Sequence, residues 1–230
     1  TRYRYSPVHR EAAVCCVPNA GRIGPWYIQH MWMKDADGLV ATLLGPAELN
    51  TLVNGKKVKI NTITEYPFGM DFRYSIHTTE GNHFAIKIRK PGWAIAVYTS
   101  LPYKEENGML VFKKKWKQQD ELIIRFEAAV QKNKAGDDEY YFSYGPLVLC
   151  HPFTHQETTT RTFTAGGIVE LSCTPAENLR YTCTGALPVE DEKGENRFLL
   201  EVNEQQKKIR LVPMAHSILR QVSFRQQATH

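Results

Sequence analysis

The chain has 230 residues, a formal net charge of +5 and a sequence pI of about 8.9. Its hydrophobic fraction of 42% and charged fraction of 23% are those of a globular protein, and they exclude a disordered or fibrous chain. No apolar run reaches the roughly 18 residues that span a membrane, and the first residues lack the apolar core of a signal peptide. We therefore expect a soluble protein that binds neither a membrane nor, because its basic residues are scattered, a nucleic acid.

Residues 18–33 predict the one helix with a clear pattern. Apolar and aromatic side chains recur there at spacings of three and four residues, which places them on one helical face. They are Ile23, Trp26, Tyr27, His30 and Met31. Pro25 is expected in or just after the first turns, and residues 35–38 (Asp-Ala-Asp-Gly) are expected to end the helix.

After Gly38 the apolar residues change from a period of about 3.6 to a period of about 2, which indicates strands. Asn54-Gly55 lies between two apolar runs and predicts a tight hairpin. Further strands are expected near residues 39–44, 72–76, 84–88, 94–100, 109–116, 121–130, 140–150, 161–172, 179–184, 197–203, 207–212 and 220–226. The Thr-rich residues 151–161 are expected to form a long loop or a seam between sub-domains. Short strands separated by turns favour one or two antiparallel β-sandwiches.

The chain has five cysteines, and their odd number and irregular spacing do not form a disulfide framework. We expect Cys150, Cys173 and Cys183 to be structural, because free cysteine is commonly a small buried hydrophobe. Cys15 and Cys16 are adjacent, which strains a disulfide between them. At a helix entrance they can instead present two thiolates to one metal ion, and the helix dipole favours the thiolate form. The alternative is that both are small buried residues before a helix.

Residues 15–19 (Cys-Cys-Val-Pro-Asn), with the helix and the Asp-Gly-Leu of residues 37–39, resemble the β-L-arabinofuranosidase family, family 127 of the glycoside hydrolases. Four more motifs of that family follow in the same order. They are residues 64–68 (Thr-Glu-Tyr-Pro-Phe), residues 88–94 (Ile-Arg-Lys-Pro-Gly-Trp-Ala), Trp116 followed by Asp120, and residues 144–148 (Tyr-Gly-Pro-Leu-Val). The third has Gln119 where the family usually has Gly. The resemblance covers about residues 12–150, and five motifs in order are fairly specific.

This resemblance implies the C-terminal portion of an enzyme in which an (α/α)6 barrel precedes β-sandwich domains. Residues 1–36 would be a remnant of the catalytic barrel that carries the Cys-Cys motif and one helix. Residues 37–150 would form a β-sandwich, and residues 151–230 a second β-sandwich or the completing strands of the first. The expected fold class is therefore mainly β, with one or two antiparallel β-sandwich domains after a short helical segment.

The family uses a cysteine nucleophile and a zinc ion, and it retains the anomeric configuration. The resemblance assigns the nucleophile and one zinc ligand to Cys15 and a second zinc ligand to Cys16. The family's remaining ligands come from an upstream Glu-x-Cys pattern, which this chain lacks. Because a zinc site needs about four ligands, we expect this chain alone to be inactive and the missing barrel to be its partner. The implied substrate is a plant-type arabinofuranoside glycan.

Three other groups could carry chemistry, and each has a plainer interpretation. His151, His155 and Glu157 could hold a metal, although histidines scattered in a loop are more often simply solvated. Lysines 113–115 and 117 could bind a polyanion, but we favour a solvated strand end. The carboxylates that could form an acid/base pair, although such groups usually lie at the surface, are Glu65, Asp71 and Glu80.

Two other functional classes stay open. The chain could be a carbohydrate-binding sandwich without chemistry, with an aromatic platform on which sugars stack. The platform would comprise Trp93, Tyr98, Tyr103 and Trp116, although Trp93 is more easily placed in a core or corner. Alternatively, the chain could be a structural or interaction module, with an exposed apolar patch and a homo-oligomeric state.

Overall fold

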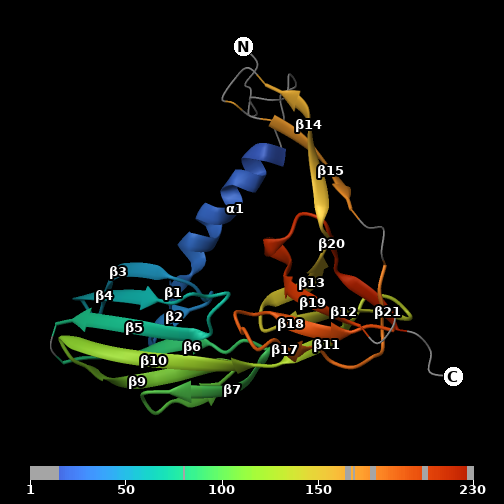
Figure 1. The fold of residues 1–230 in the computed structure, drawn as a ribbon. Helices are drawn as coiled ribbons and strands as arrows, with labels where there is room; N and C mark the ends of the chain where they lie inside the picture. The colour runs from blue at the N-terminus through green and yellow to red at the C-terminus, as the bar shows by residue number, and fades with distance from the viewer. Residues whose placement is uncertain are drawn as a thin grey trace. The chain divides into compact units, whose positions relative to one another are not determined.

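The computed structural model describes residues 16–79, 81–163, 167, 169–176, 180–203 and 207–226, and the side chains from Asn19 onward. The fold is mainly β, as expected, with several antiparallel sheets (Figure 1). Within the described residues there is one α-helix, α1 (Cys16–His30), and a short 3-10 helix, η2 (Met214–His216). The chain divides into two compact units, Asn19–Ala128 and Ala129–His230 with Thr1–Pro18. The expected division of the chain after residues 36 and 150 stays a prediction.

Helix α1 begins before Pro18 and ends at His30, three residues earlier than expected. Residues 32–34 form strand β1 (Trp32–Lys34), which pairs with β2 (Gly38–Ala41). The reason is the turn between them, in which the Asp35 carboxylate accepts the backbone N–H groups of Asp37 and Gly38 at 2.9 and 3.0 Å. Residues 35–38, which were expected to end the helix, instead connect β1 to the start of β2. Pro25 lies inside the helix, where it removes one backbone hydrogen bond.

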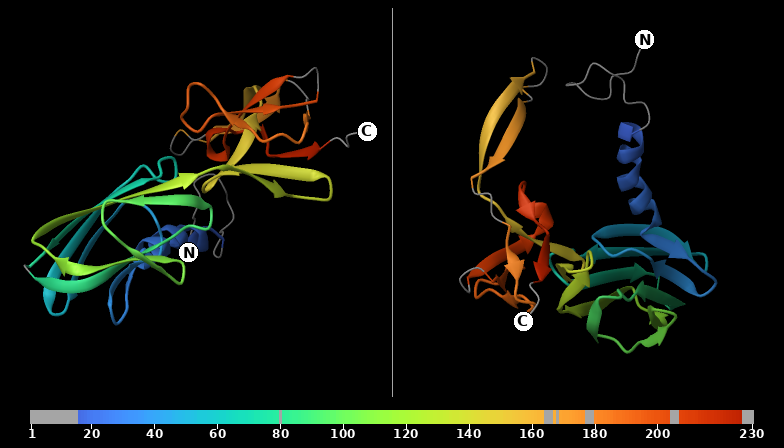
Figure 2. Two further views of the ribbon diagram at one scale, coloured as in Figure 1. Left: turned by 90° about the horizontal axis from the view of Figure 1, so that it is seen from below. Right: turned by 90° about the vertical axis from the view of Figure 1, so that its right-hand side faces the viewer.

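The first unit contains two five-stranded sheets that form a sandwich (Figure 2). One sheet has the order β1, β2, β6 (Asn82–Arg89), β9 (Met109–Trp116) and β8 (Lys104–Glu106). The other has the order β3 (Ala47–Val53), β4 (Lys56–Ile63), β5 (Asp71–Thr78), β10 (Gln119–Ala128) and β7 (Ala94–Thr99). Alternate residues of β4, β5 and β10 are buried between the sheets, as the period of 2 predicts. The largest fully buried side chains of this core are Trp116, Tyr74, Phe72, Phe84, Phe112 and Phe126.

The Asn54-Gly55 hairpin is confirmed, and it is tied to the opposite sheet. Both turn residues have positive φ, 51° and 73°, as a two-residue hairpin turn requires. Asn82, at the start of β6, is 1% exposed and donates to the Val53 carbonyl and the Thr78 hydroxyl, each at 3.2 Å. Its side-chain oxygen accepts from the Asn54 amide at 3.2 Å. One buried amide therefore links the two sheets, with its own polar atoms satisfied.

Gly38 is required by the pairing of β2 with β6, which is parallel. Its φ is +154°, and a Cβ atom at this position would lie 2.2 Å from the carbonyl oxygen of Ala85. Backbone atoms cannot move out of the way as a flexible side chain can. Only glycine therefore permits this close approach of the two strands.

The second unit is organised around a nine-stranded sheet. Its strands are β11 (Val130–Lys134), β12 (Glu139–Tyr144), β13 (Leu147–Pro152), β16 (Thr182–Cys183), β17 (Val189–Glu190), β18 (Phe198–Glu201), β19 (Lys208–Pro213), β20 (Arg220–Gln221) and β21 (Ser223–Gln226). The single strand expected at 140–150 is wrong, because Gly145, with φ of 55°, turns the chain between β12 and β13. The core comprises Phe142, Leu149, Cys183, Phe198, Leu200, Leu211 and Phe224, among others.

The loop expected at residues 151–161 is also wrong. Strand β13 continues to Pro152, and β14 (His155–Thr162) pairs antiparallel with β15 (Val169–Pro175). Its run of threonines suits an extended strand, because β-branched side chains favour that conformation. The two strands form a separate hairpin, seen as an extended arm in Figure 2, and most of its positions are exposed.

We predict that Gly38→Ala lowers the free energy of unfolding by about 3 kcal/mol, since it adds backbone strain and a clash with Ala85. Gly92→Ala is the matched control, because a Cβ atom there meets nothing within 4 Å. Urea unfolding of both variants measures the difference. An equal loss in the two would contradict the assigned strand pairing.

The turn between β1 and β2 also carries an ion pair. The Lys87 ammonium lies 2.6 Å from one Asp35 oxygen and 3.1 Å from Asp37. The hydrogen bond from Lys87 holds the pKa of Asp35 below its usual range, against a smaller opposing effect of burial. A carboxylate whose pKa is lower in the folded state stabilises the fold above its unfolded pKa of roughly 3.9. That contribution is lost as pH falls through the folded-state pKa.

Lys87→Met should therefore make the acid-induced loss of stability shallower between about pH 5 and about pH 1. The effect should be small, because both charged groups are partly solvated. Lys115→Met is the control, because Lys115 lies in the same sheet, opposite His83. Unfolding free energies over this pH range check the prediction, and parallel curves for wild type and Lys87→Met would contradict it.

Candidate functional site

The cysteine pair lies at the entrance of α1. Cys15 is outside the described residues, and Cys16 is the first residue of the helix, with its side chain also outside them. A thiolate at this position would lie at the positive end of the helix dipole. The assigned roles, nucleophile and zinc ligand for Cys15 and zinc ligand for Cys16, stay predictions.

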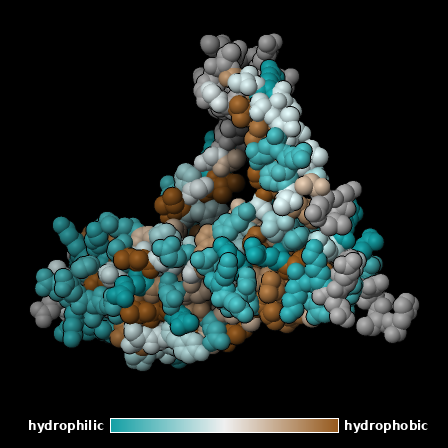
Figure 3. Space-filling model, viewed as in Figure 1, coloured by the Kyte–Doolittle hydropathy of each residue, from teal (hydrophilic) through white to brown (hydrophobic). Residues whose placement is uncertain are grey.

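Helix α1 exposes its apolar side chains along much of its length, as the brown residues in Figure 3 indicate. Trp26 is 63% exposed and stacks on His30 with ring centroids 4.1 Å apart. The other large exposed apolar residues of α1 are Ile23, Tyr27 and Ile28. Water is a poor environment for so many apolar groups, which indicates a surface that packs against something else.

Two of the family-like motifs meet in one pocket of the first unit. The pocket has a volume of about 320 Å³ and is lined by Tyr27, residues 42–44, Tyr66, Arg89 and residues 91–93. Trp93 is half-buried, with its ring edge-on to Phe126 at 5.9 Å. Burial raises the pKa of Tyr66, with a smaller opposing effect of the Arg89 charge. Aromatic rings, a phenol and a guanidinium together form a setting in which a sugar can stack and hydrogen-bond.

The expected aromatic platform is not assembled. Trp116 is fully buried and donates its indole N–H to the Phe84 carbonyl at 3.0 Å. Trp93 packs against the core, as its alternative interpretation predicts. Tyr98 is exposed and donates to Glu127 at 2.7 Å. These rings therefore belong to different environments and do not present one face to a glycan.

The charged candidates lie at the surface. Glu65 and Asp71 are exposed, and Glu80 lies outside the described residues. In the lysine cluster, Lys113 lies 3.6 Å from Asp37 and Lys114 lies 3.2 Å from Asp120. This local balance of charge is typical of a solvated strand end.

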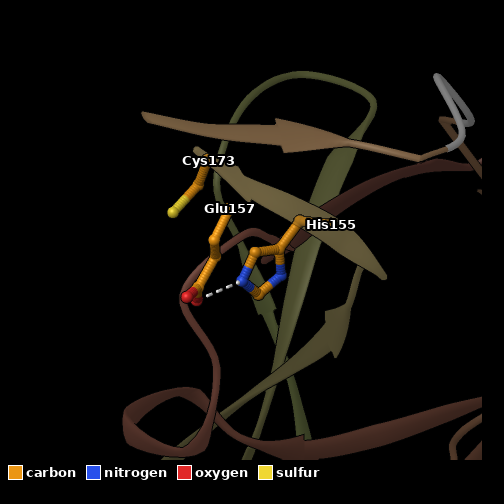
Figure 4. A group of neighbouring side chains, drawn as sticks. All are labelled: His155, Glu157 and Cys173. Carbon is orange, nitrogen blue, oxygen red and sulfur yellow. Dashed lines mark hydrogen bonds and ion pairs between the residues drawn. The ribbon is translucent and has the colours of Figure 1, made fainter. Parts of the chain in front are cut away.

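His151, His155 and Glu157, which composition allowed as a metal trio, are not the group that the structure brings together. Nδ1 of His151, in β13, lies 2.9 Å from the Arg210 carbonyl oxygen, and its ring packs edge-on against Phe153 and Tyr181. The ligand atoms of His155, Glu157 and Cys173 instead lie within 4.8 Å of one another (Figure 4).

Cys173 is therefore the residue that the sequence analysis missed. It was expected to be a buried structural cysteine, but it is partly exposed on the β14–β15 hairpin. Cys150 and Cys183 are fully buried, as expected, and burial raises the pKa of Cys150. An antiparallel pairing of residues 155–175 would have placed Glu157 opposite Cys173, but the threonine-rich stretch was interpreted as a loop.

Within the described part of the chain, no helix has both the length and the apolar character needed to cross a bilayer. No curated protein sequence matches this chain. Residues 38–128 match the family model described as the middle domain of GH127 β-L-arabinofuranosidases.

Solved structures share the fold over 94% of the chain. One is Ara127N, a GH127 β-L-arabinofuranosidase from Geobacillus stearothermophilus T6, with a TM-score of 0.62 and 18% identity. Others are described as a glycoside hydrolase, with a TM-score of 0.63 and 15% identity, and as a GH127 β-arabinofuranosidase, with 0.60 and 18%. The chain spans only 38%, 40% and 39% of their respective lengths. Residues 38–128 thus match the GH127 middle domain, and the chain as a whole shares its fold with part of these hydrolases.

Proposed function

We propose that this chain is the C-terminal portion of a retaining β-L-arabinofuranosidase-like glycoside hydrolase that acts on plant-type glycans. The observation that carries the proposal is the match of residues 38–128 to the GH127 middle domain. The common fold over 94% of the chain and the Cys-Cys-Val-Pro-Asn segment support it. The active enzyme would also need a catalytic barrel, with which this chain would combine.

In this proposal, the Cys15 thiolate attacks the anomeric carbon as the glycosidic bond to the leaving group breaks, and water later displaces the thiolate, because retention requires two successive displacements. Cys16 would hold the metal beside it. Zinc, when bound, keeps a coordinating thiol in its deprotonated form at neutral pH. The donor set of this chain fits the ion only in part, since the cysteine pair supplies two of about four ligands and no Glu-x-Cys follows or precedes it.

The apolar surface of α1 supports a missing barrel as partner. The helix contains two glycines and two prolines, so its intrinsic stability is low and its stability in the protein must come largely from packing. Its large apolar side chains nevertheless remain exposed among the described residues. Barrel helices would cover them. In the alternative, an interaction module, a second copy would cover them and the mass in solution would rise with concentration.

We expect no release of L-arabinose from an aryl β-L-arabinofuranoside by this chain alone. The same chain, fused behind a GH127 barrel that carries the Glu-x-Cys pattern, should be active. Cys15→Ser in the fusion should then lower kcat by about 10³-fold or more, since the nucleophile is lost. Cys150→Ser is the matched control, because that thiol is fully buried in strand β13. Release of L-arabinose by the chain alone would contradict the proposal, and so would an unchanged kcat of the fusion after Cys15→Ser.

The pocket at Trp93 favours a second candidate function, in which the first sandwich binds carbohydrate without chemistry. The pocket combines aromatic rings with Arg89 at its rim. A sugar ring stacked on an aromatic side chain would lose much of its binding free energy when that ring is removed.

Trp93→Ala should then weaken binding of arabinose-containing oligosaccharides about tenfold, as measured by calorimetry. Tyr98→Ala, which removes an exposed ring outside the pocket, should bind like wild type. Thermal unfolding shows whether Trp93→Ala keeps its fold despite losing the contact with Phe126. Identical affinities in a folded Trp93→Ala variant would exclude this function for the pocket.

A further inference from the structure

We propose that the β14–β15 hairpin carries a second metal site, in which His155, Glu157 and Cys173 bind a zinc-like divalent cation. These residues lie far along the chain from the cysteine pair at α1, and none of the family-like motifs includes them.

The strand register brings the three side chains together. Glu157 is directly opposite Cys173 in the antiparallel pair, and His155 is two residues before Glu157. Residues two apart in a strand share a face, and directly opposed residues have neighbouring Cβ atoms. The three side chains therefore point to one side of the hairpin, as Figure 4 shows.

The distances suit a tetrahedral ion. Nε2 of His155 lies 3.2 Å from Oε1 of Glu157. Bonds of roughly 2.1 Å to a tetrahedral zinc ion place two such ligand atoms about 3.4 Å apart. The Cys173 sulfur lies within 4.8 Å of both other ligand atoms, against about 3.6 Å in a zinc site. A small rotation of an exposed side chain closes that difference.

Hydrogen bonding already orients the imidazole as a ligand. Nδ1 of His155 lies 3.4 Å from the carbonyl oxygen of Phe153, which can only accept, so the tautomer protonated at Nδ1 can donate to it. In the neutral ring, Nε2 then directs its lone pair at the Glu157 carboxylate, and both atoms are acceptors. A cation between them makes the contact favourable. A proton engages only these two groups, whereas a metal ion also engages the Cys173 thiolate.

The donor set selects the kind of ion. One nitrogen, one oxygen and one sulfur ligand suit zinc, while calcium and magnesium prefer oxygen ligands throughout. Three protein ligands leave a fourth position for water. His155 is 20% exposed and Glu157 46% exposed, so a hydrated ion can reach them without opening a core. Because the ligands come from both strands, the ion would hold β14 and β15 together. Most positions of β14 are exposed, so few buried contacts stabilise this pairing.

The test uses the full 230-residue chain in a Cys15→Ser/Cys16→Ser background, so that the α1 pair cannot contribute. Zn²⁺ binding is measured by calorimetry, and Co²⁺ serves as a spectroscopic probe, because a thiolate ligand produces a charge-transfer band. We expect one ion per chain and a thiolate–Co²⁺ band. Cys173→Ser should abolish the band and weaken Zn²⁺ binding about 100-fold or more, and Glu157→Gln should weaken Zn²⁺ binding while keeping the band.

Two matched controls lie on the same hairpin. Gln156→Ala changes the opposite face of β14, and Glu170→Gln removes a carboxylate further along β15. Both should bind Zn²⁺ like the background protein. The proposal would be overturned if the protein did not bind one Zn²⁺ ion per chain or if Cys173→Ser left Zn²⁺ binding unchanged. An equal loss of Zn²⁺ binding in the two control variants would also overturn it. Circular dichroism without metal establishes that the variants are folded, which is expected because the hairpin lies outside both cores.

Discussion

The parallel pairing of β2 with β6 is the constraint on which the first unit depends. It brings Gly38 against the Ala85 backbone, and it carries the short β1 strand and its Asp35 turn with it. Thr42, just after β2, connects this sheet to the end of α1, since its N–H donates to the Met31 carbonyl at 3.0 Å. The C-terminal end of α1 is therefore anchored to the sheet that this strand pairing organises.

The same pairing also builds the Trp93 pocket. Residues 42–44 follow β2, and Arg89 ends β6, so the parallel alignment puts both at the same edge of the sheet. Residues that look unrelated in the sequence, from α1, the 64–68 motif and the 88–94 motif, meet there. This strand pairing thus helps to bring residues of two family-like motifs into one pocket.

The two proposed metal sites use thiolates in different ways. At the start of α1, the two cysteines that are adjacent in the sequence would supply only part of a ligand set, so their chemistry would depend on residues from another part of an enzyme. On the hairpin, three different donor types come from two paired strands and form a nearly complete set by themselves. The cysteine pair suits a reaction that requires ligands from another part of the enzyme. The three hairpin ligands suit a metal ion that stabilises the pairing of two strands.

Alternation of apolar residues was enough to predict strands such as β5 in the first sandwich, because burial between two sheets imposes a period of 2 on Phe72, Tyr74 and Ile76. The Asn54-Gly55 turn was also predictable, because few residues adopt positive φ at both positions. The end of α1 was not predictable from the sequence, because residues 32–34 leave the helical pattern only through the pairing of β1 with β2. The role of Cys173 likewise required the tertiary structure. Its proximity to His155 and Glu157 arises from strand register, which local sequence does not encode when neither face of the hairpin is buried.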